Sequence, residues 1–365
     1  MKICHITIVH KRSDIRIFHK ECKSLKNLSN DIHIVVADGL GDEVVDGIEI
    51  HDLGKPSGRL SRFLYTAKKA RAKAESIRAD IYHLHDPELL RISKALKRKN
   101  FAKVIFDSHE DTPGQILSKP YIPFFLRKIV SVLVEYYENR TLKSLDGIVT
   151  ATPYIRDRLK KINNNCIDIN NFPLLKEIDI SEEVTEKENK VCFIGGISEI
   201  RGITELVKAL EFLNTSLDLA GEIPIDYKNK LQKIKGWEKV NELGFISREK
   251  AMQVKKSSLA GIVTFLPVPN HINAQPNKIF EYMASGIPVI GSHFKLWKDI
   301  IESNNCGICV NPGKPEEVAN AIKIILQNPD KAESMGNNGI KLVQEKYNWN
   351  IEEIKLINFY KSVLD

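Results

Sequence analysis

Lys278 and Glu281 stand near the expected start of a helix, in the stretch from Asn273 to Gly291. Apolar residues recur at helical spacing after Pro276, and Gly286 is a typical residue for ending such a helix. A helix N-terminus binds anions because its first backbone N–H groups lack partners and its dipole is positive there. A lysine in the first turn is unfavourable for the helix itself, so we expect a negative ligand such as a diphosphate beside Lys278.

Glu281 lies one turn further along the same helix. A carboxylate in that place can accept hydrogen bonds from a ribose diol, as the acidic residue of a dinucleotide site does. The same residues also fit an ordinary surface helix in which Lys278 and Glu281 form a pair three positions apart. The local residues leave both interpretations open.

Two histidines, His85 and His109, each follow an apolar segment with the character of a strand. In an open parallel sheet, ligands bind outside the carboxyl ends of the strands, so both side chains are expected near a site. For His109, with Asp107 and Glu110 close in sequence, we expect a functional role. For His85 we expect a loop histidine with local hydrogen bonds.

Short apolar segments alternate with amphipathic helical segments twice along the chain. This alternation predicts an α/β protein with two doubly wound parallel sheets. We expect a first domain at residues 1–172, a linker at 173–189 and a second domain at 190–347. The last segment, residues 348–365, has an apolar helical face that needs a surface outside the second domain.

The chain has 365 residues and a globular composition. It contains no apolar run of transmembrane length, and its N-terminus lacks a signal-peptide cleavage region, so we expect a cytoplasmic protein. Six cysteines are spread widely, and only Cys306 and Cys309 have metal or redox spacing. No second pair accompanies them, so we expect two small hydrophobes in a strand rather than a zinc site.

Basic residues are concentrated in the first half of the chain. Residues 1–180 hold 31 Lys and Arg against 23 Asp and Glu, whereas residues 181–365 hold 23 against 24. This excess fits an anionic membrane surface, an acidic acceptor or a mild surface imbalance. The basic residues are scattered rather than striped, so nucleic acid is not expected as a partner. The segment Phe124–Lys128 fits membrane contact weakly, and we expect it to face the core.

The sequence Pro-Asn-Lys-x-Phe-Glu-Tyr-Met-Ala-x-Gly-x-Pro-Val-Ile over residues 276–290 resembles the donor-binding helix of glycosyltransferase family 4, also called group 1. These enzymes are retaining sugar-nucleotide transferases of the GT-B fold. The resemblance covers nearly the whole chain and is strongest over residues 190–312. It implies two Rossmann-like domains that face a cleft and a C-terminal helix that crosses back to the first domain.

The family usually carries two glutamates eight positions apart in this region. Glu281 matches the second, which the resemblance implies holds the donor ribose. The first is implied to touch the donor sugar, and this chain has Asn273 there. An amide can hydrogen-bond to sugar hydroxyls but carries no negative charge, so Asn273 departs from any mechanism that needs a carboxylate.

Gly195, Gly196 and Arg201 resemble the family's glycine turn, where glycine lets the backbone approach a diphosphate closely. Many members have an arginine where this chain has Gly196, so we expect Lys278 to supply the second cation. A plain tight turn is the alternative. The chain has no Asp-x-Asp sequence, the metal signature of the other major glycosyltransferase fold. We therefore predict a metal-independent enzyme without a cofactor.

His109 ends a segment that matches the family strand whose terminal histidine faces the donor sugar. We expect it to position the sugar or to assist proton movement at the acceptor. Asp14, Arg16 and Glu110 are expected on the acceptor side. Many members carry two glycines near Asp14, and this chain does not. Arg16 fits an acceptor phosphate or a structural salt bridge equally well.

The segment Gly244–Ile246, which contains Gly244, Phe245 and Ile246, would end a strand of the donor domain close to a nucleobase. Backbone groups there could bind the base edge. The leading interpretation is a hexosyl- or N-acetylhexosaminyltransferase. It would use a nucleoside-diphosphate sugar and a glycan or polyprenyl-linked glycan acceptor in the synthesis of surface polysaccharides such as capsule or O-antigen. It would lie in the cytoplasm, with a peripheral position at the inner face of the cell membrane as a further expectation.

Two other functions remain open from the sequence. A non-hydrolysing sugar-nucleotide epimerase has the same two-domain architecture and would turn over the donor without an acceptor. A non-catalytic sugar-nucleotide-binding protein is the other alternative, because Asn273 is not a carboxylate.

Overall fold

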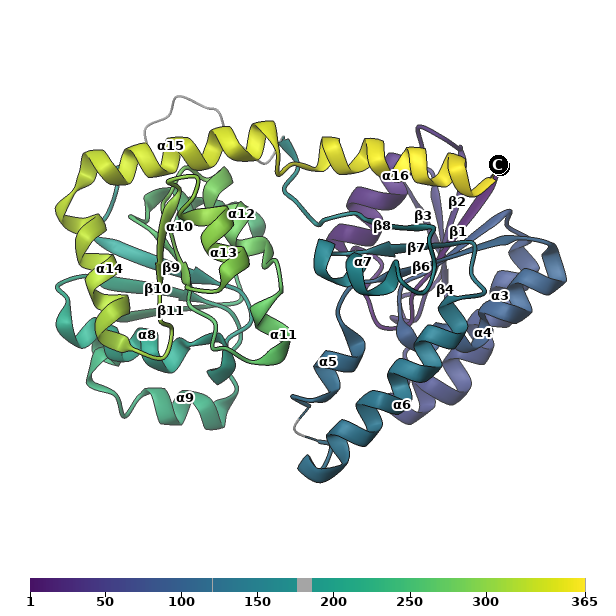
Figure 1. The fold of residues 1–365 in the computed structure, drawn as a ribbon, viewed down its shortest axis with the longest axis horizontal. Helices are drawn as coiled ribbons and strands as arrows, with labels where there is room; N and C mark the ends of the chain where they lie inside the picture. The colour runs from purple at the N-terminus through teal and green to yellow at the C-terminus, as the bar shows by residue number, and fades with distance from the viewer. Residues whose placement is uncertain (120, 176–185, 365) are drawn as a thin grey trace. The chain divides into compact units, whose positions relative to one another are not determined.

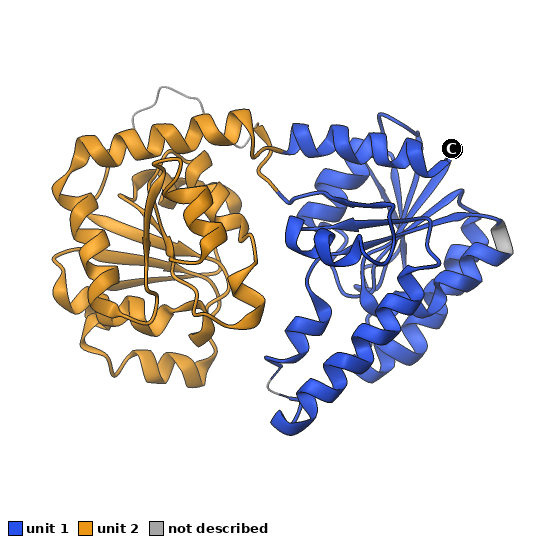
Figure 2. Cartoon of the chain, viewed as in Figure 1, with its two compact units in different colours: residues 1–171, 349–365 blue, residues 172–348 orange. Residues whose placement is uncertain are grey.

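The computed structural model describes residues 1–119, 121–175 and 186–364 (Figure 1). The chain divides into two compact units, one formed by Met1–Asn171 with Trp349–Asp365 and the other by Phe172–Asn348 (Figure 2). We call them unit 1 and unit 2. Much of the expected linker lies outside the described residues.

Unit 1 is built on an eight-stranded sheet in the order β3-β4-β2-β1-β5-β6-β7-β8. Every strand pair is parallel except β3 with β4. The edge hairpin turns at Asp46 and Gly47, which both have positive φ. The strands are β1 (Lys2–Ile6), β2 (Asp31–Val36), β3 (Glu43–Val45), β4 (Ile48–Asp52), β5 (Ile81–Leu84), β6 (Lys103–Ser108), β7 (Gly147–Thr150) and β8 (Cys166–Asp168).

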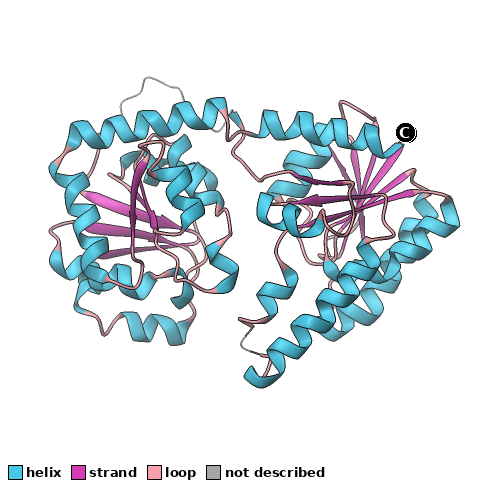
Figure 3. Cartoon of the chain, in the orientation of Figure 1, coloured by secondary structure: helices cyan, strands magenta, loops and turns pink. Residues whose placement is uncertain are grey.

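Helices pack around this sheet (Figure 3). They are η1 (Ile15–Cys22), α1 (Lys23–Leu25), α2 (Arg59–Ser61), η2 (Arg62–Thr66), α3 (Ala67–Ile77), η3 (Pro87–Leu89), α4 (Leu90–Asn100), α5 (Thr112–Ile116), α6 (Phe124–Leu142), α7 (Pro153–Leu159) and α16 (Trp349–Leu364). The segments η1 and η2 are π-helical, a wider winding that is often found at functional sites.

The last helix, α16, completes the core of unit 1. Leu356 and Tyr360 are fully buried, and Trp349 donates its indole N–H to Ser24 Oγ at 2.9 Å. Glu352 accepts a hydrogen bond from the backbone N–H of Asn170 at 2.8 Å. The helix therefore buries its apolar face on unit 1.

Unit 2 contains a six-stranded sheet in the order β11-β10-β9-β12-β13-β14, and all its pairs are parallel. The two sheets confirm the predicted α/β class. The strands are β9 (Lys190–Ile194), β10 (Ser216–Ala220), β11 (Val240–Gly244), β12 (Gly261–Val263), β13 (Val289–Ser292) and β14 (Gly307–Val310). The helices are η5 (Glu199–Arg201), α8 (Ile203–Ala209), η6 (Leu210–Phe212), α9 (Ile225–Leu231), η7 (Lys235–Lys239), α10 (Arg248–Ser257), α11 (Pro269–Ile272), α12 (Asn277–Ala284), α13 (Lys295–Ile301), α14 (Pro315–Gln327) and α15 (Pro329–Glu345).

The helix α12 is packed tightly into unit 2. The ring of Tyr282 occupies the place where a side chain at Gly261 of β12 would lie. On its other side, a Cβ at Gly339 of α15 would already be 3.1 Å from Met283. Because small residues face α12 on both sides, its start is held at a fixed place beside the sheet.

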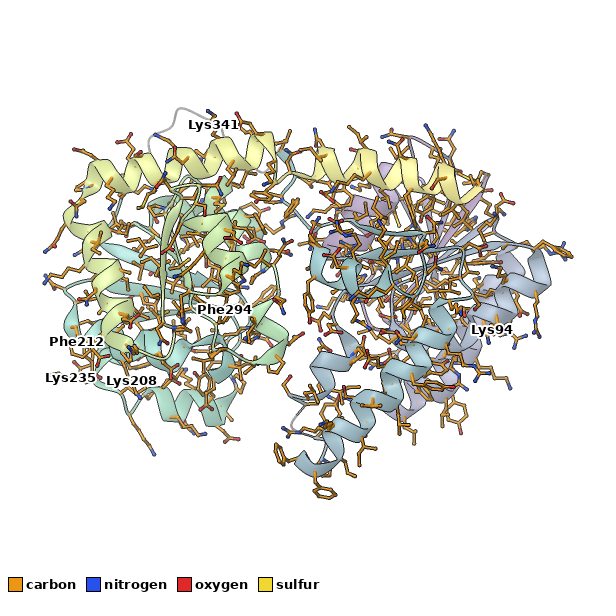
Figure 4. All side chains as sticks on the ribbon, in the orientation of Figure 1. Lys94, Lys208, Phe212, Lys235, Phe294 and Lys341 are labelled. Atoms are coloured by element: carbon orange, nitrogen blue, oxygen red, sulfur yellow. The ribbon has the colours of Figure 1, made fainter. Side chains whose placement is uncertain are left out.

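Many side chains follow the expected division between surface and core, but several large apolar side chains are exposed. Lys94, Lys208, Lys235 and Lys341 are exposed, whereas Phe294 is buried (Figure 4). The prediction that Phe124–Lys128 faces the core is wrong, because Phe124 and Phe125 are 84% and 75% exposed. In the described ranges, no helix combines the length and apolar character needed to cross a membrane.

Candidate functional site

The glycine turn after β9 lies beside the start of α12. Gly195 has a φ of 134°, and a Cβ there would overlap the ammonium end of Lys278. At Gly196 a Cβ would lie 2.6 Å from Arg201 Nη1, which donates to the Gly196 carbonyl at 2.8 Å. The structure therefore brings together all four residues that were predicted for the diphosphate.

Lys278 carries the electrostatic signature of an anion site. Burial and the nearby Arg201 charge lower the pKa of its ammonium from the usual 10.5 to about 8. Each cation also lies near an aromatic ring, with Lys278 Nζ 5.7 Å from the centroid of Phe193 and Arg201 Cζ 5.5 Å from that of Phe265. Two cations held together in a partly apolar place are stabilised when a polyanion binds between them.

Tyr282 fixes the distance between α12 and the glycine turn. Its buried hydroxyl accepts a hydrogen bond from the backbone N–H of Ile194 at 3.1 Å, one residue before Gly195. Sequence inspection missed this role, since Tyr282 reads only as part of the family pattern. Glu281, in the next position back, is 43% exposed and lies 4.0 Å from Lys255 Nζ of α10. It is free to accept hydrogen bonds from a ligand.

Glycines with positive φ stand at the carboxyl ends of three neighbouring strands of unit 2: Gly195 directly follows β9, Gly221 directly follows β10, and Gly244 is the last residue of β11. Gly221 donates its N–H to the Gly244 carbonyl at 2.8 Å, and a Cβ at Gly221 would overlap the Gly195 carbonyl. The strand ends therefore approach one another closely, and of these three glycines it is Gly244 that has open space around it. Phe245 follows with 86% of its side chain exposed, and Ile246 is half-buried. A planar ring can stack on such an aromatic side chain.

Asn273 ends α11 and begins the loop into α12. The loop is tied down by Trp297, whose indole N–H donates to the Ala274 carbonyl at 2.7 Å. Asn273 itself is half-buried.

In unit 1, a buried ion pair organises the end of β6. Arg16 donates from Nε and Nη2 to the two oxygens of Asp107 at 2.8 and 2.9 Å, and from Nη1 to the Ile169 carbonyl at 2.6 Å. Burial would raise the pKa of Asp107, but Arg16 and His109 outweigh it and hold that pKa well below its usual range. Arg16 is only 4% exposed and serves this structural pair. It does not present its guanidinium to an acceptor.

His109 is oriented by that same carboxylate. Its Nε2 lies 3.0 Å from Asp107 Oδ2 and 3.2 Å from His85 Nδ1, and its side chain is 17% exposed. With Nε2–H donated to Asp107, Nδ1 is left as the basic nitrogen. This arrangement suits a histidine that accepts or positions a proton.

His85 is part of this network, contrary to the expectation of a loop histidine. It is buried and contacts both His5, at 2.9 Å, and His109. Burial lowers the pKa of His85 to about 4, so the ring is neutral near pH 7. Its place after the strand was visible in the sequence, but its buried contacts with His5 and His109 were not.

Asp14 and His10 border the same network. Asp14 caps η1 by accepting from the N–H groups of Arg16 and Ile17, and its Oδ2 lies 3.4 Å from His10 Nδ1. Burial alone would lower the pKa of His10, but Asp14 and Asp86 outweigh it and raise that pKa. His10 was not predicted; its ring lies 4.8 Å from that of His109. The side chain of Glu110 is exposed.

Two α/β units with polar residues and glycines at the carboxyl ends of their strands define the GT-B class of protein. Two family models match the sequence. The model for glycosyltransferase family 4 matches residues 16–169, and the model for glycosyl transferases group 1 matches residues 176–342. The chain belongs to the family 4, group 1 glycosyltransferases.

Similar proteins agree with this assignment. An uncharacterized glycosyltransferase of Methanocaldococcus jannaschii is 29% identical over 50% of this chain and 47% of its own length. A second from the same organism is 20% identical over 64% of this chain and 62% of its own length. The chain thus spans about half to three-fifths of these relatives.

Solved structures share the fold. Sucrose-phosphate synthase from Thermosynechococcus elongatus has a TM-score of 0.82 at 17% identity and covers 100% of this chain and 99% of its own. HepE of Anabaena in complex with UDP-glucose has a TM-score of 0.74 at 15% identity and covers 99% of this chain and 100% of its own.

A first prediction concerns the pH dependence of nucleotide binding. A diphosphate beside Lys278 raises the pKa of its ammonium above the free value of about 8. Affinity is therefore full below pH 8 and falls as pH rises through it, by up to about tenfold per pH unit. Isothermal titration with a nucleoside diphosphate between pH 7 and 9.5 measures this. Lys278→Arg, charged throughout, should flatten the slope; an unchanged slope in that variant would show that another group titrates.

A second prediction concerns His109. His109→Ala should lower the rate of sugar transfer by about 100-fold or more, because it removes a positioned acid–base group. The dissociation constant of the nucleotide should stay unchanged, since the nucleotide residues belong to unit 2. His51→Ala is the matched control, because His51 of β4 forms a similar contact with another histidine, His33 of β2. Equal rates in both variants would remove His109 from the catalytic machinery.

Proposed function

We propose that this chain transfers a sugar from a nucleoside-diphosphate donor to a hydroxyl group of a glycan or polyprenyl-linked glycan, with retention of configuration. The observation that carries this proposal is the convergence of Lys278 and Arg201 on the Gly195–Gly196 turn at the start of α12. Glu281 lies one turn further on, in place for a ribose diol. HepE, which has the same fold, was solved with UDP and with UDP-glucose, and this supports a nucleotide-sugar donor.

The chemistry follows from charge. Breaking the bond between sugar and phosphate leaves extra negative charge on the departing diphosphate. Lys278, Arg201 and the N–H groups at the start of α12 are arranged before the reaction and would stabilise that charge without a metal ion. Positive charge grows on the sugar carbon at the same time, and the acceptor hydroxyl attacks it. In this proposal His109 assists the acceptor proton and Asn273 binds a sugar hydroxyl.

The two other functions make different demands on the same residues. An epimerase would consume the donor with no acceptor present. A binding protein would hold the nucleotide and leave the donor intact. We favour transfer because His109 is held by Asp107 with one nitrogen available, which a binding protein does not need.

The third prediction tests the donor site. A nucleotide at ~100 times its dissociation constant stabilises unit 2 by about 2.7 kcal/mol. Thermal unfolding with UDP, GDP, CDP and ADP should identify one base that raises the midpoint by several degrees. Glu281→Ala should lose most of that shift, and Glu345→Ala, an exposed glutamate on α15, should keep it. The corresponding nucleotide sugar is then incubated with and without lipid-linked acceptors.

The outcomes of this experiment separate the alternatives. Product that forms only with acceptor supports transfer, donor conversion without acceptor supports the epimerase, and binding without turnover supports the binding protein. If no nucleotide shifts the wild-type protein, the assignment of Lys278, Arg201 and Glu281 to a diphosphate site is wrong.

We further propose that unit 1 rests on an anionic membrane, where a polyprenyl-linked acceptor would lie. The support is an exposed aromatic face on α2, η2 and α6 and at Tyr121 before α6, accompanied by Arg59, Arg127 and Lys128. Arg59 of α2 lies 4.0 Å from the ring of Tyr121, so this contact joins α2 to the segment before α6. The aromatic face consists of Leu60, Phe63, Leu64, Tyr65, Tyr121, Phe124, Phe125, Ile129, Val132, Leu133 and Tyr136.

The fourth prediction tests this face. Flotation with vesicles that contain phosphatidylglycerol should retain the protein, and neutral phosphatidylcholine vesicles should retain much less. Replacing Phe124 and Phe125 by serine should weaken binding by about 3 kcal/mol or more, because two large apolar side chains no longer enter the lipid. Phe212→Ser, at a residue 60% exposed on unit 2, is the control. Wild-type dimers that dissociate on the double substitution would instead assign the face to self-association.

A further inference from the structure

Unit 1 contains a buried group of four side chains that the proposed function does not use. His5 lies on β1, Glu21 on η1, His83 on β5, and His85 directly follows β5. One nitrogen or oxygen from each lies within 4.8 Å of the others. All four side chains are at most 2% exposed. We call this group the histidine–glutamate cluster.

Glu21 is the residue in this cluster that needs an explanation. Neither of its carboxyl oxygens has a hydrogen-bond partner. Arg16 Nε lies 3.0 Å from Glu21 Oε1, but its N–H groups are already directed at Asp107 and the Ile169 carbonyl. A buried carboxylate without a hydrogen bond is costly unless a cation or a proton compensates it.

The three histidines surround the other oxygen of Glu21. Nitrogens of His5, His83 and His85 lie 4.0, 3.9 and 3.9 Å from Glu21 Oε2. These three distances are too long for hydrogen bonds. Two of the same nitrogens, His5 Nδ1 and His85 Nε2, lie 2.9 Å apart, at hydrogen-bond distance, so the separations within the cluster lie on both sides of the one expected between ligands of one ion. A tetrahedral ion with bonds of about 2.0–2.1 Å separates its ligand atoms by roughly 3.3 Å.

Charge in the region points the same way. Arg16 brings one positive charge, and the carboxylates of Asp107 and Glu21 bring two negative ones when both are ionised. The winding of η1 places Arg16 and Glu21, five positions apart, on the same side, because a π-helix repeats near that interval. Without such an ion, burial and the nearby Asp107 carboxylate raise the pKa of Glu21 well above its usual range, so that a proton balances the charge. A cation in the histidine–glutamate cluster would take the place of that proton.

We propose that His5, Glu21, His83 and His85 bind a divalent transition-metal ion, with Zn²⁺ as the ion best suited to three imidazoles and one carboxylate. Groups suited to orient the ligands are in place around them. Asp107 Oδ2 lies 3.4 Å from His85 Nδ1, a carboxylate–histidine arrangement typical of metal sites.

Tyr360 of α16 also contacts this cluster. Its hydroxyl lies 3.4 Å from His5 Nε2 and 2.7 Å from His83 Nδ1. The ion would therefore join β1, β5 and η1. Binding through His83 Nδ1 would replace the hydrogen bond between that nitrogen and Tyr360. All four ligands come from protein and none is exposed, so the site is closed and structural. It is separate from the diphosphate residues of unit 2, whereas it adjoins the proposed catalytic residue, because His85 Nδ1 lies 3.2 Å from His109 Nε2.

The experiment measures metal in the untagged full-length chain. The protein is expressed in zinc-replete medium and dialysed against a chelator that strips exposed ions. Mass spectrometry should then find about one zinc ion per chain, and Glu21→Gln should hold less than about one tenth of that. His51→Ala is the matched control, because His33, Glu49 and His51 form a second, more exposed group of potential ligands. That variant should keep the ion.

Refolding supplies a measurement that needs no variant. Because the site is closed, the ion must enter as the chain folds. Wild-type protein refolded with Zn²⁺ should melt at a higher temperature than protein refolded with chelator, and refolding with Co²⁺ should give the absorption bands of tetrahedral cobalt. Wild-type protein without tightly held metal, with equal melting temperatures and no cobalt bands, would overturn the proposal. So would an ion retained at full occupancy in both Glu21→Gln and His83→Gln.

Discussion

Both units depend on one constraint: the carboxyl ends of parallel strands meet at the same edge of a sheet, where the chain leaves the apolar core. In unit 2 that edge carries glycines, which remove side chains and open the backbone to a ligand. In unit 1 it carries His85, Asp107 and His109, which fill the edge with hydrogen bonds. The same topology thus produces a cluster of glycines and cations in one unit and a packed polar network in the other.

In unit 2, Lys278 and Arg201 are held near each other although their positive charges repel. Burial and the neighbouring Arg201 both disfavour the charged form of Lys278 and lower its pKa to about 8. The packing of Tyr282 against Gly261 and its hydrogen bond with Ile194 hold α12 in place all the same. Stability of the apolar core therefore maintains an arrangement of cations that loss of the Lys278 proton or a bound anion would relieve.

Local rules predicted much of this from sequence. The glycine that ends α12, the apolar strands and the glycine turn each follow from backbone conformation and periodicity. The contents of the histidine–glutamate cluster could not be predicted, because strands buried on both faces show no alternation that marks His5 or His83 as special. From the sequence, Arg16 fitted an acceptor phosphate and a structural salt bridge equally well. The folded structure shows that its partner is Asp107. The exposure of Phe124 contradicts the expectation because apolar composition alone does not say which surface a helix meets.

Asn273 is where the proposed chemistry and the family pattern differ most. A neutral amide leaves the positive charge of Lys278 and Arg201 undiminished, so the hold on a diphosphate is not weakened by a neighbouring carboxylate. The same amide cannot offset positive charge that grows on the sugar carbon. In the proposed reaction the departing diphosphate then becomes the main anion beside that carbon. By holding the diphosphate, Lys278 and Arg201 would stabilise its negative charge and would also keep that charge beside the positive sugar carbon.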